Sequence, residues 1–224
     1  MFIGGQIVIS STNANEICIN GMSFSKRDSL WANAALVVTI DPDDPILDAY
    51  RDKHGVLAGL AFQREMEQRA AEMGGGNLVV PVQRVTDFIN AIPSTSAPSS
   101  SYRLGVKPSP CHEIYPPRIN EALKDAIINY FNKQMPGFLS EDALLHAVET
   151  RTSSPVRVSR DPKTKQAIGV KGLFPSGEGA GFAGGIISAS VDGLNVAYSV
   201  LDDLDLTPME DERIGFDRNI GFDY

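Results

Sequence analysis

A run of glycines near the C-terminus contains the residue types best suited to holding a cofactor. Seven of the 20 glycines lie between Gly172 and Gly193, and residues 177–185 read GEGAGFAGG. Glycine inside a helix costs about 1 kcal/mol relative to alanine, so this crowding at a predicted helix start indicates that the backbone approaches another molecule closely. A helix start presents free N–H groups and partial positive charge, which suit a phosphate or the electron-rich edge of a flavin.

Glu178 is the one carboxylate within this glycine run. Its oxygens would accept hydrogen bonds from the hydroxyls of a ribityl or ribose chain. The alternative interpretation is structural: the glycines permit a tight turn and close packing of the helix on a strand, and Glu178 merely lies near a helix start. An isolated glycine-rich loop favours the structural interpretation, so the cofactor interpretation needs support from other segments.

A second cluster of polar residues, ETRTSSP, occupies residues 149–155 just before a predicted strand. Arg151 would hold an anionic substrate or flank a cofactor. The alternative makes Arg151 an ordinary ion-pair partner of Glu149 and the hydroxyl residues plain turn formers. If the first interpretation holds, the further candidates for substrate contact are the adjacent hydroxyl residues Thr152, Ser153 and Ser154.

Composition excludes several classes of protein. The formal net charge of −8 has the wrong sign for a nucleic-acid partner. Cys18 and Cys111 are far apart and only His112 adjoins either of them, so we expect neither a disulfide framework nor a metal site. No apolar stretch approaches the ~20 residues of a membrane span, and no signal peptide is evident. We therefore expect an intracellular soluble protein.

The elements that would position these clusters are a mixture of strands and helices. Hydrophobic alternation predicts strands over 6–10 and 16–19, paired as a hairpin, over 35–40, and over 78–82, where Pro81 favours an edge position. Helical spacing predicts helices over 57–73, 117–131, 140–148 and 183–197. A second hairpin is predicted over 156–173, and the serine-rich residues 92–101 are predicted to form a mobile loop.

The last residues differ in composition from the rest of the chain. Between residues 202 and 224 there are eight acidic residues, only two arginines and few apolar side chains. Such a segment cannot bury enough apolar surface to form a core of its own. We expect it to be a mobile, solvated tail.

Taken together, widely spaced segments resemble the bacterial and plastid family of uncharacterised FAD-dependent dehydrogenases, which are large FAD-dependent oxidoreductases with an inserted domain. The combination of ETRTSSPVR and GEGAGFAGGI is the most specific part of this resemblance. The matching segments extend from Gly4 to about Ala197 and comprise 4–5, 20–23, Arg27, 33–38, 59–64, 81–85, 101–102, 149–157, 177–185, 188–189 and 192–193.

The resemblance implies an α/β (mixed α+β) fold: the C-terminal half of a discontinuous FAD-binding domain with an inserted substrate-side region. In that family the Rossmann half that binds the nucleotide, a strand, turn and helix with a GxGxxG motif, lies upstream of the matching segments, and the resemblance implies that this half is missing here. The implied segments are a remainder of the FAD domain at 1–82, the inserted region at 83–147, flavin-proximal strands and the C-terminal helix at 148–201, and the acidic tail at 202–224.

The resemblance also implies where a flavin would lie: its ribityl chain beside the Gly-Glu segment and its isoalloxazine ring at the start of the final helix. The implied FAD contacts are Gly177, Glu178, Gly179, Ala180, Gly181, Gly184 and Gly185. FAD would bind weakly, or only together with a complementary polypeptide that carries the GxGxxG motif. The implied compartment is the cytoplasm, or the plastid in a photosynthetic eukaryote.

We therefore expect the C-terminal portion of an FAD-dependent oxidoreductase, in which the flavin supplies the redox chemistry and the protein supplies orientation and electrostatics. The alternative is a degenerate or split-gene product that folds on a partner chain and catalyses nothing. The sequence points to no particular small-molecule substrate, electron donor or acceptor, and to no catalytic acid, base or nucleophile.

Overall fold

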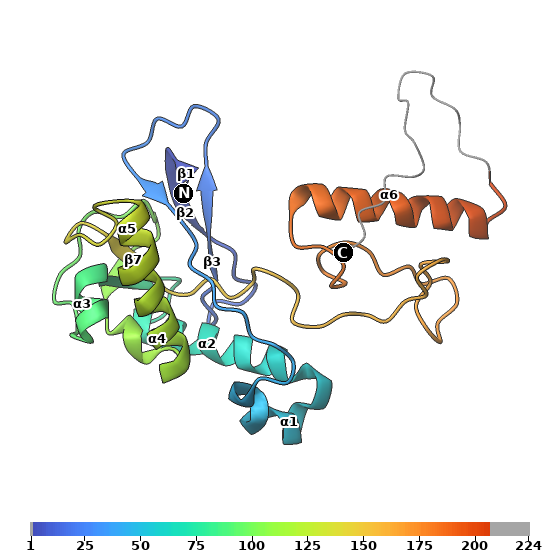
Figure 1. The fold of residues 1–224 in the computed structure, drawn as a ribbon, viewed down its shortest axis with the longest axis horizontal. Coiled ribbons are helices and arrows are strands. Elements are labelled where there is room, and N and C mark those ends of the chain that lie inside the picture. Colours follow the sequence, from blue (N-terminus) through green and yellow to red (C-terminus); the bar gives the residue numbers. More distant parts are fainter. Residues whose placement is uncertain (1, 207–224) are drawn as a thin grey trace. The chain divides into compact units, whose positions relative to one another are not determined.

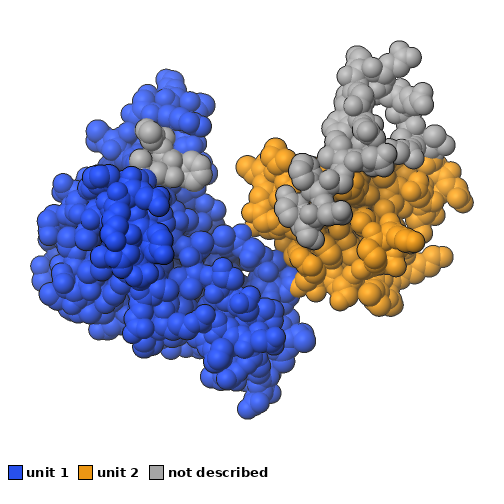
Figure 2. All heavy atoms as spheres, viewed as in Figure 1, with its two compact units in different colours: residues 1–156 blue, residues 157–224 orange. Residues whose placement is uncertain are grey.

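The computed structural model of the protein describes residues 2–206. It divides into two compact units, residues 1–156 and residues 157–224, called unit 1 and unit 2 below (Figure 2). The four-segment division implied by the family resemblance is finer and stays a prediction. The predicted mobile tail lies mostly outside the described residues. Within residues 2–206, no helix combines the length and apolar composition that crossing a bilayer requires.

Unit 1 combines small sheets with helices (Figure 1). Its strands are β1 (Phe2–Ile3), β2 (Gly5–Ile9), β3 (Ile19–Ser23), β4 (Ala32–Asn33), β5 (Val80–Arg84), β6 (Val106–Pro108) and β7 (Leu144–His146). Its α-helices are α1 (Asp48–His54), α2 (Ala58–Gly74), α3 (Val85–Asn90), α4 (Pro117–Asp125) and α5 (Asn132–Gln134), with 3-10 turns at Pro45–Leu47, Gly55–Leu57 and Cys111–Glu113. This content confirms the coarse prediction of a mixed α/β chain.

The predicted N-terminal hairpin is confirmed, with its second strand shifted along the chain. Strands β2 and β3 pair antiparallel, with Ile9 opposite Ile19 and Gly5 opposite Ser23. The strand predicted over 35–40 is wrong, because this segment has no ladder partner. Its apolar residues Val38 and Ile40 instead pack on the core as extended coil.

Helix α2 confirms the predicted helix over 57–73 within a residue at each end. It buries Phe62, Met66 and Ala70 in a core shared with β3 and β5. The helix ends where Gly75 adopts a φ of 88°, a left-handed conformation that glycine takes without strain. Glu67, a charged residue of the same helix, is also buried.

Strand β5 is the centre of a three-stranded sheet in the order β6-β5-β7, so the predicted edge position of Pro81 is wrong. Pro81 lacks an N–H, and the ladder with β7 begins only at Val82, so no ladder donor is lost. The short helix predicted over 140–148 is also wrong. Its apolar residues instead form β7, which pairs antiparallel with β5.

The helix predicted over 117–131 is confirmed and runs without a break from Pro117 to Gln134. Its middle, Ala126–Phe131, is π-helical, and it ends ahead of Pro136. Ile127 is fully buried and forms a second cluster with Val85 and Phe88. The helix contributes to both clusters, because its Ile119 is buried in the core of α2 and its Leu123 packs against both.

Unit 2 consists of turns and loops followed by helix α6 (Ile186–Asp203) (Figure 1). The second predicted hairpin is confirmed only as a chain reversal. Asp161 N donates to Gln166 O and Ile168 N donates to Ser159 O, but a single bridge between Arg160 and Ala167 replaces the expected strands. The C-terminal helix is confirmed, although it begins after the glycine run rather than within it.

Candidate functional site

The glycine run forms a loop that leads directly into α6, which begins at Ile186 rather than within the run. Gly177 and Gly181 have φ values of 68° and 82°, which L-residues with a side chain rarely adopt. Both glycines belong to one turn, which is closed by a hydrogen bond from Phe182 N to Gly177 O at 3.0 Å. These two glycines are therefore explained by the local backbone conformation.

Gly179 and Gly184 are not explained in that way. Neither has a φ in the left-handed region, and no atom of residues 2–206, chain neighbours aside, lies within 4 Å of the position that a Cβ would take at either residue. Close packing of the helix on a strand, the structural alternative, therefore does not account for them. They leave bare backbone facing open space within unit 2, next to the start of α6.

Two arginines of the preceding segment hold this loop. Asp192 on α6 accepts hydrogen bonds from Gly177 N at 2.8 Å and from both terminal nitrogens of Arg160, at 3.0 and 2.5 Å. The Arg160 guanidinium also lies 3.5 Å from the centre of the Phe182 ring. Arg157 Nε donates to Gly181 O at 2.8 Å. The loop is thus fixed in shape without any bound molecule.

Electrostatics agree with this geometry. Burial raises the pKa of Asp192, but the hydrogen bonds from Arg160 and from Gly177 N outweigh it and hold the pKa below its ordinary value. Asp192 is therefore ionised at neutral pH and paired with Arg160, whose side chain is 7% exposed. No local pattern in the sequence indicates this pair, because its members are 32 residues apart.

Glu178 lies at the exposed outer side of the loop. Its carboxylate makes no hydrogen bond or ion pair with any residue of the part that the structure describes. Ser188 Oγ accepts from Gly185 N at 3.1 Å, and the first-turn amides of α6 have no intrahelical acceptor, as at any helix start. A free carboxylate and free N–H groups therefore lie on one short segment.

Arg151 belongs to unit 1, and its partner is not the Glu149 of the structural alternative. Its Nε and Nη2 donate to the two carboxylate oxygens of Glu67 at 2.9 and 2.7 Å. Thr150 Oγ1 donates to the same carboxylate at 2.6 Å. The Glu67 side chain is only 2% exposed, and its hydrogen bond raises the pKa of Arg151 above its ordinary value.

The other residues of this polar run are less engaged. Thr152 and Ser153 are exposed, and Ser154 Oγ donates to Val156 O at 2.7 Å. The predicted substrate contacts at 151–154 therefore lie in unit 1, and the predicted cofactor contacts at 177–185 lie in unit 2. Substrate contact by residues 151–154 and cofactor contact by residues 177–185 both stay predictions.

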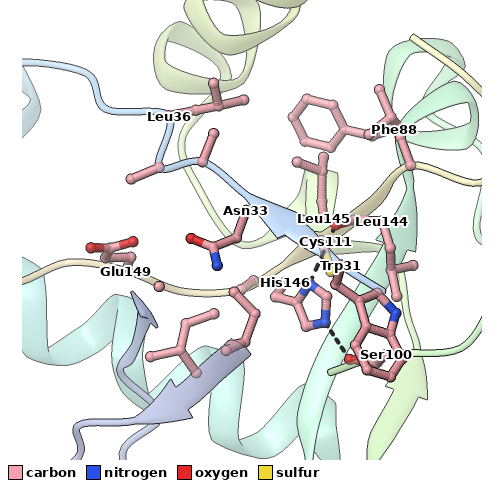
Figure 3. A pocket seen from close by; sticks show the side chains of 18 of the residues that line it. Trp31, Asn33, Leu36, Phe88, Ser100, Cys111, Leu144, Leu145, His146 and Glu149 are labelled. Carbon is pink, nitrogen blue, oxygen red and sulfur yellow. Dashed lines mark hydrogen bonds between the residues drawn. The ribbon is translucent and has the colours of Figure 1, made fainter. Parts of the chain in front are cut away.

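Sequence reasoning missed a cavity of about 380 Å³ in unit 1 (Figure 3). Its lining includes His146 from β7, Asn33 from β4, and Trp31, Ser100 and Glu149 from loops. These residues are spread over more than a hundred positions of the sequence. The one available signal was His146, a single histidine in an apolar run, but that run was predicted to be helical.

The described residues give no sign of metal chemistry. No three His, Cys, Asp or Glu side chains between residues 2 and 206 are grouped to hold an ion. Both cysteines are free and buried, and burial raises the pKa of Cys111 to about 12, so that thiol is protonated at neutral pH.

Comparison with known proteins gives two matches. Residues 1–152 match the family described as FAD-dependent protein, C-terminal domain-like. An uncharacterized protein of Clostridium beijerinckii is 44% identical over 205 residues, which make up 91% of this chain and 37% of that relative. The chain thus spans little more than a third of the length of this relative.

Proposed function

The chain belongs to the family of FAD-dependent proteins, C-terminal domain-like, and on that basis we propose that it contributes the flavin-facing part of an FAD-dependent oxidoreductase. Residues 1–152 carry the family match, whereas the proposed flavin contacts, Gly177 to Gly185, lie beyond it in unit 2. The observation that carries their assignment is the bare backbone at Gly179 and Gly184, which internal packing does not explain.

In this proposal each part of the loop has a distinct task. The Glu178 carboxylate accepts hydrogen bonds from ribityl hydroxyls, and Gly179 and Gly184 allow the backbone to approach the flavin without a side chain between them. The N–H groups at the start of α6 face the electron-rich edge of the isoalloxazine ring. When bound, the flavin supplies the redox chemistry, and this chain supplies orientation and charge.

Pre-organisation by arginines supports this assignment. Because Arg160, Asp192 and Arg157 hold the loop in one shape, little conformational entropy would be lost when a flavin binds. Arg157 is exposed, hydrogen-bonds through Nε alone among its guanidinium nitrogens in the described residues, and lies 5.1 Å from the centre of the Phe182 ring, so it brings positive charge to the loop. Sequence reasoning did not single out this cation.

The substrate-side assignment follows from the polar run of unit 1. Thr152 and Ser153 are exposed and stay candidates for contact with a small-molecule substrate. Arg151 is bound to Glu67 through Nε and Nη2, and its Nη1 donates to Ser10 O at 3.4 Å and to Thr12 Oγ1 at 3.2 Å, but its side chain is 37% exposed, so the Nη1 edge borders solvent. We propose that Arg151 orients this run and contacts the substrate only through that edge.

A second candidate function is a chain that folds on a partner and catalyses nothing. The observation that favours it is the apolar surface of α6, where only Val196 is buried in the described residues. Ile186 and Ile187 are 87% and 75% exposed. A complementary polypeptide with a GxGxxG motif would cover such a surface both in an FAD-dependent enzyme and in a chain without catalysis. A measurement of flavin binding is therefore needed to distinguish these two functions.

We expect the 224-residue chain alone to bind FAD weakly, with a Kd of about 10 μM or more, because in this proposal the Rossmann half that contacts the nucleotide belongs to the complementary polypeptide. Titration of FAD fluorescence with the purified chain measures this, and the titration is repeated with the complementary polypeptide present.

Tighter binding on adding the complementary polypeptide supports the proposal. Nanomolar binding by the chain alone would contradict the need for a complementary part. Absence of binding at millimolar FAD, with or without that polypeptide, would reject the flavin role and favour the non-catalytic alternative.

A further inference from the structure

The cavity of unit 1 is formed by residues of that unit alone, so it is independent of the glycine loop of unit 2. Most of its wall is apolar: Leu36, Phe88, Leu123, Ile127, Leu144 and Leu145 line it. Its volume of about 380 Å³ lies at the lower end of the range for small-molecule sites. The size and walls therefore suit a compact apolar molecule.

The histidine in this cavity is held neutral and is already hydrogen-bonded. His146 Nδ1 lies 3.3 Å from Leu144 O, and its Nε2 lies 2.7 Å from Ser100 Oγ (Figure 3). Nδ1 therefore carries the proton, and Ser100 donates to Nε2. Burial lowers the pKa of His146 to about 4, so it adds no positive charge at neutral pH and is too weak a base to activate Ser100.

Two oxygen acceptors of the cavity lack partners. Asn33 Nδ2 donates to Met22 O at 3.1 Å, which fixes the amide orientation and leaves Oδ1 without a hydrogen bond from the described residues. A Cβ at Gly21 would lie 2.4 Å from that oxygen, so a side chain at this position would displace the Asn33 amide. The half-buried Glu149 carboxylate likewise has no hydrogen bond or ion pair among residues 2–206.

Charge decides which kind of molecule these acceptors would hold. The charged residues in the described lining are Glu149 and Asp142, and the lining contains no lysine or arginine. Burial raises the pKa of Glu149, because the ionised carboxylate loses hydration there. A cation bound next to the carboxylate would offset this loss. The hydroxyls of Ser101 and Tyr115 are neutral and can serve either as donors or as acceptors. An anion would meet two carboxylates and no compensating positive charge.

We propose that this cavity binds a small apolar amine, with its ring or alkyl part against the apolar wall and its ammonium group paired with Glu149 and the Asn33 oxygen. The same two carboxylates would repel phosphate groups, so we do not expect this cavity to bind a nucleotide. The inference concerns a second ligand and does not rest on the flavin role of unit 2.

The test compares three probes of nearly equal shape: 2-phenylethylamine, 2-phenylethanol and 3-phenylpropionate. The sequence contains one tryptophan, and Trp31 lines the cavity, so its fluorescence reports occupancy. We expect the amine to bind the 224-residue chain with a Kd of about 1 mM, at least about tenfold more tightly than the alcohol, and the carboxylate to bind most weakly. Ligand-observed NMR on the same samples measures the affinities independently of fluorescence.

Glu149→Gln should remove the tenfold preference for the amine and leave the affinity for 2-phenylethanol unchanged. Glu72→Gln is the matched control, because Glu72 is an exposed carboxylate on α2 that does not line the cavity. This control should keep the preference. The proposal is overturned if the amine does not bind, if 3-phenylpropionate binds as tightly as the amine, or if the preference survives in Glu149→Gln.

Discussion

Arg151→Ala is expected to lower the free energy of unfolding of unit 1 by about 3 kcal/mol, because it leaves a buried carboxylate without its cation. Glu67 is 2% exposed and is held by two hydrogen bonds from Arg151 and one from Thr150. The Thr150 hydroxyl would remain, but it cannot neutralise the charge. Urea unfolding followed by Trp31 fluorescence measures the difference.

The controls separate the ion pair from a general loss of charge. Arg103→Ala removes an exposed arginine of unit 1 and should change the free energy of unfolding by less than about 0.5 kcal/mol. Adding Glu67→Gln to Arg151→Ala should restore part of the lost stability, because the buried charge is then gone. If Arg151→Ala abolished substrate use with unchanged stability, Arg151 would be a substrate contact rather than a structural partner.

Glu178→Ala should lower the affinity for FAD by about tenfold to a hundredfold when the complementary polypeptide is present, since it removes a charge-assisted hydrogen bond worth roughly 1.5–3 kcal/mol. The fold should be largely unaffected, because the exposed Glu178 carboxylate has no partner among the described residues. FAD titration and the Tm are measured on the same preparation.

Asp202→Ala is the matched control, because it removes an exposed carboxylate of α6 outside the glycine loop. It should leave FAD affinity unchanged. A lowered Tm in Glu178→Ala, with a titration identical to that of the unsubstituted chain, would assign Glu178 to the stability of the glycine loop and remove it from the cofactor site.

The sequence predicted those elements whose pattern is local. Helix α2 has apolar residues at helical spacing and a terminal glycine, and the helix from Pro117 has proline in its first turn, so both were placed closely. The strand at Leu144–His146 was predicted as a helix, because a short apolar run fits both periodicities. What decides it is the distant partner β5, which local spacing does not reveal.

In the candidate site, too, local patterns could be predicted from the sequence, whereas contacts between distant residues could not. The glycine loop was found from the sequence because five glycines lie within nine residues, but the arginine network that holds it was not. The burial of Glu67 depends on Arg151, 84 residues away, and a polar residue on a helix surface gives no hint of such a partner. The Ser100–His146 pair spans 46 residues and depends on a serine-rich segment predicted to be mobile. In the structure that segment is anchored, because Ser94 and Ser101 also accept backbone hydrogen bonds.

Hydrogen exchange at saturating FAD tests the flavin-facing assignment of unit 2 most directly. Mass spectrometry of the chain, with the complementary polypeptide present, compares peptides that cover 177–189 with peptides from unit 1. We expect FAD to slow amide exchange over 177–189 by at least about tenfold, because these N–H groups would face the bound flavin. Unchanged exchange over 177–189 while flavin fluorescence reports binding would contradict the assignment, as would slowing confined to unit 1.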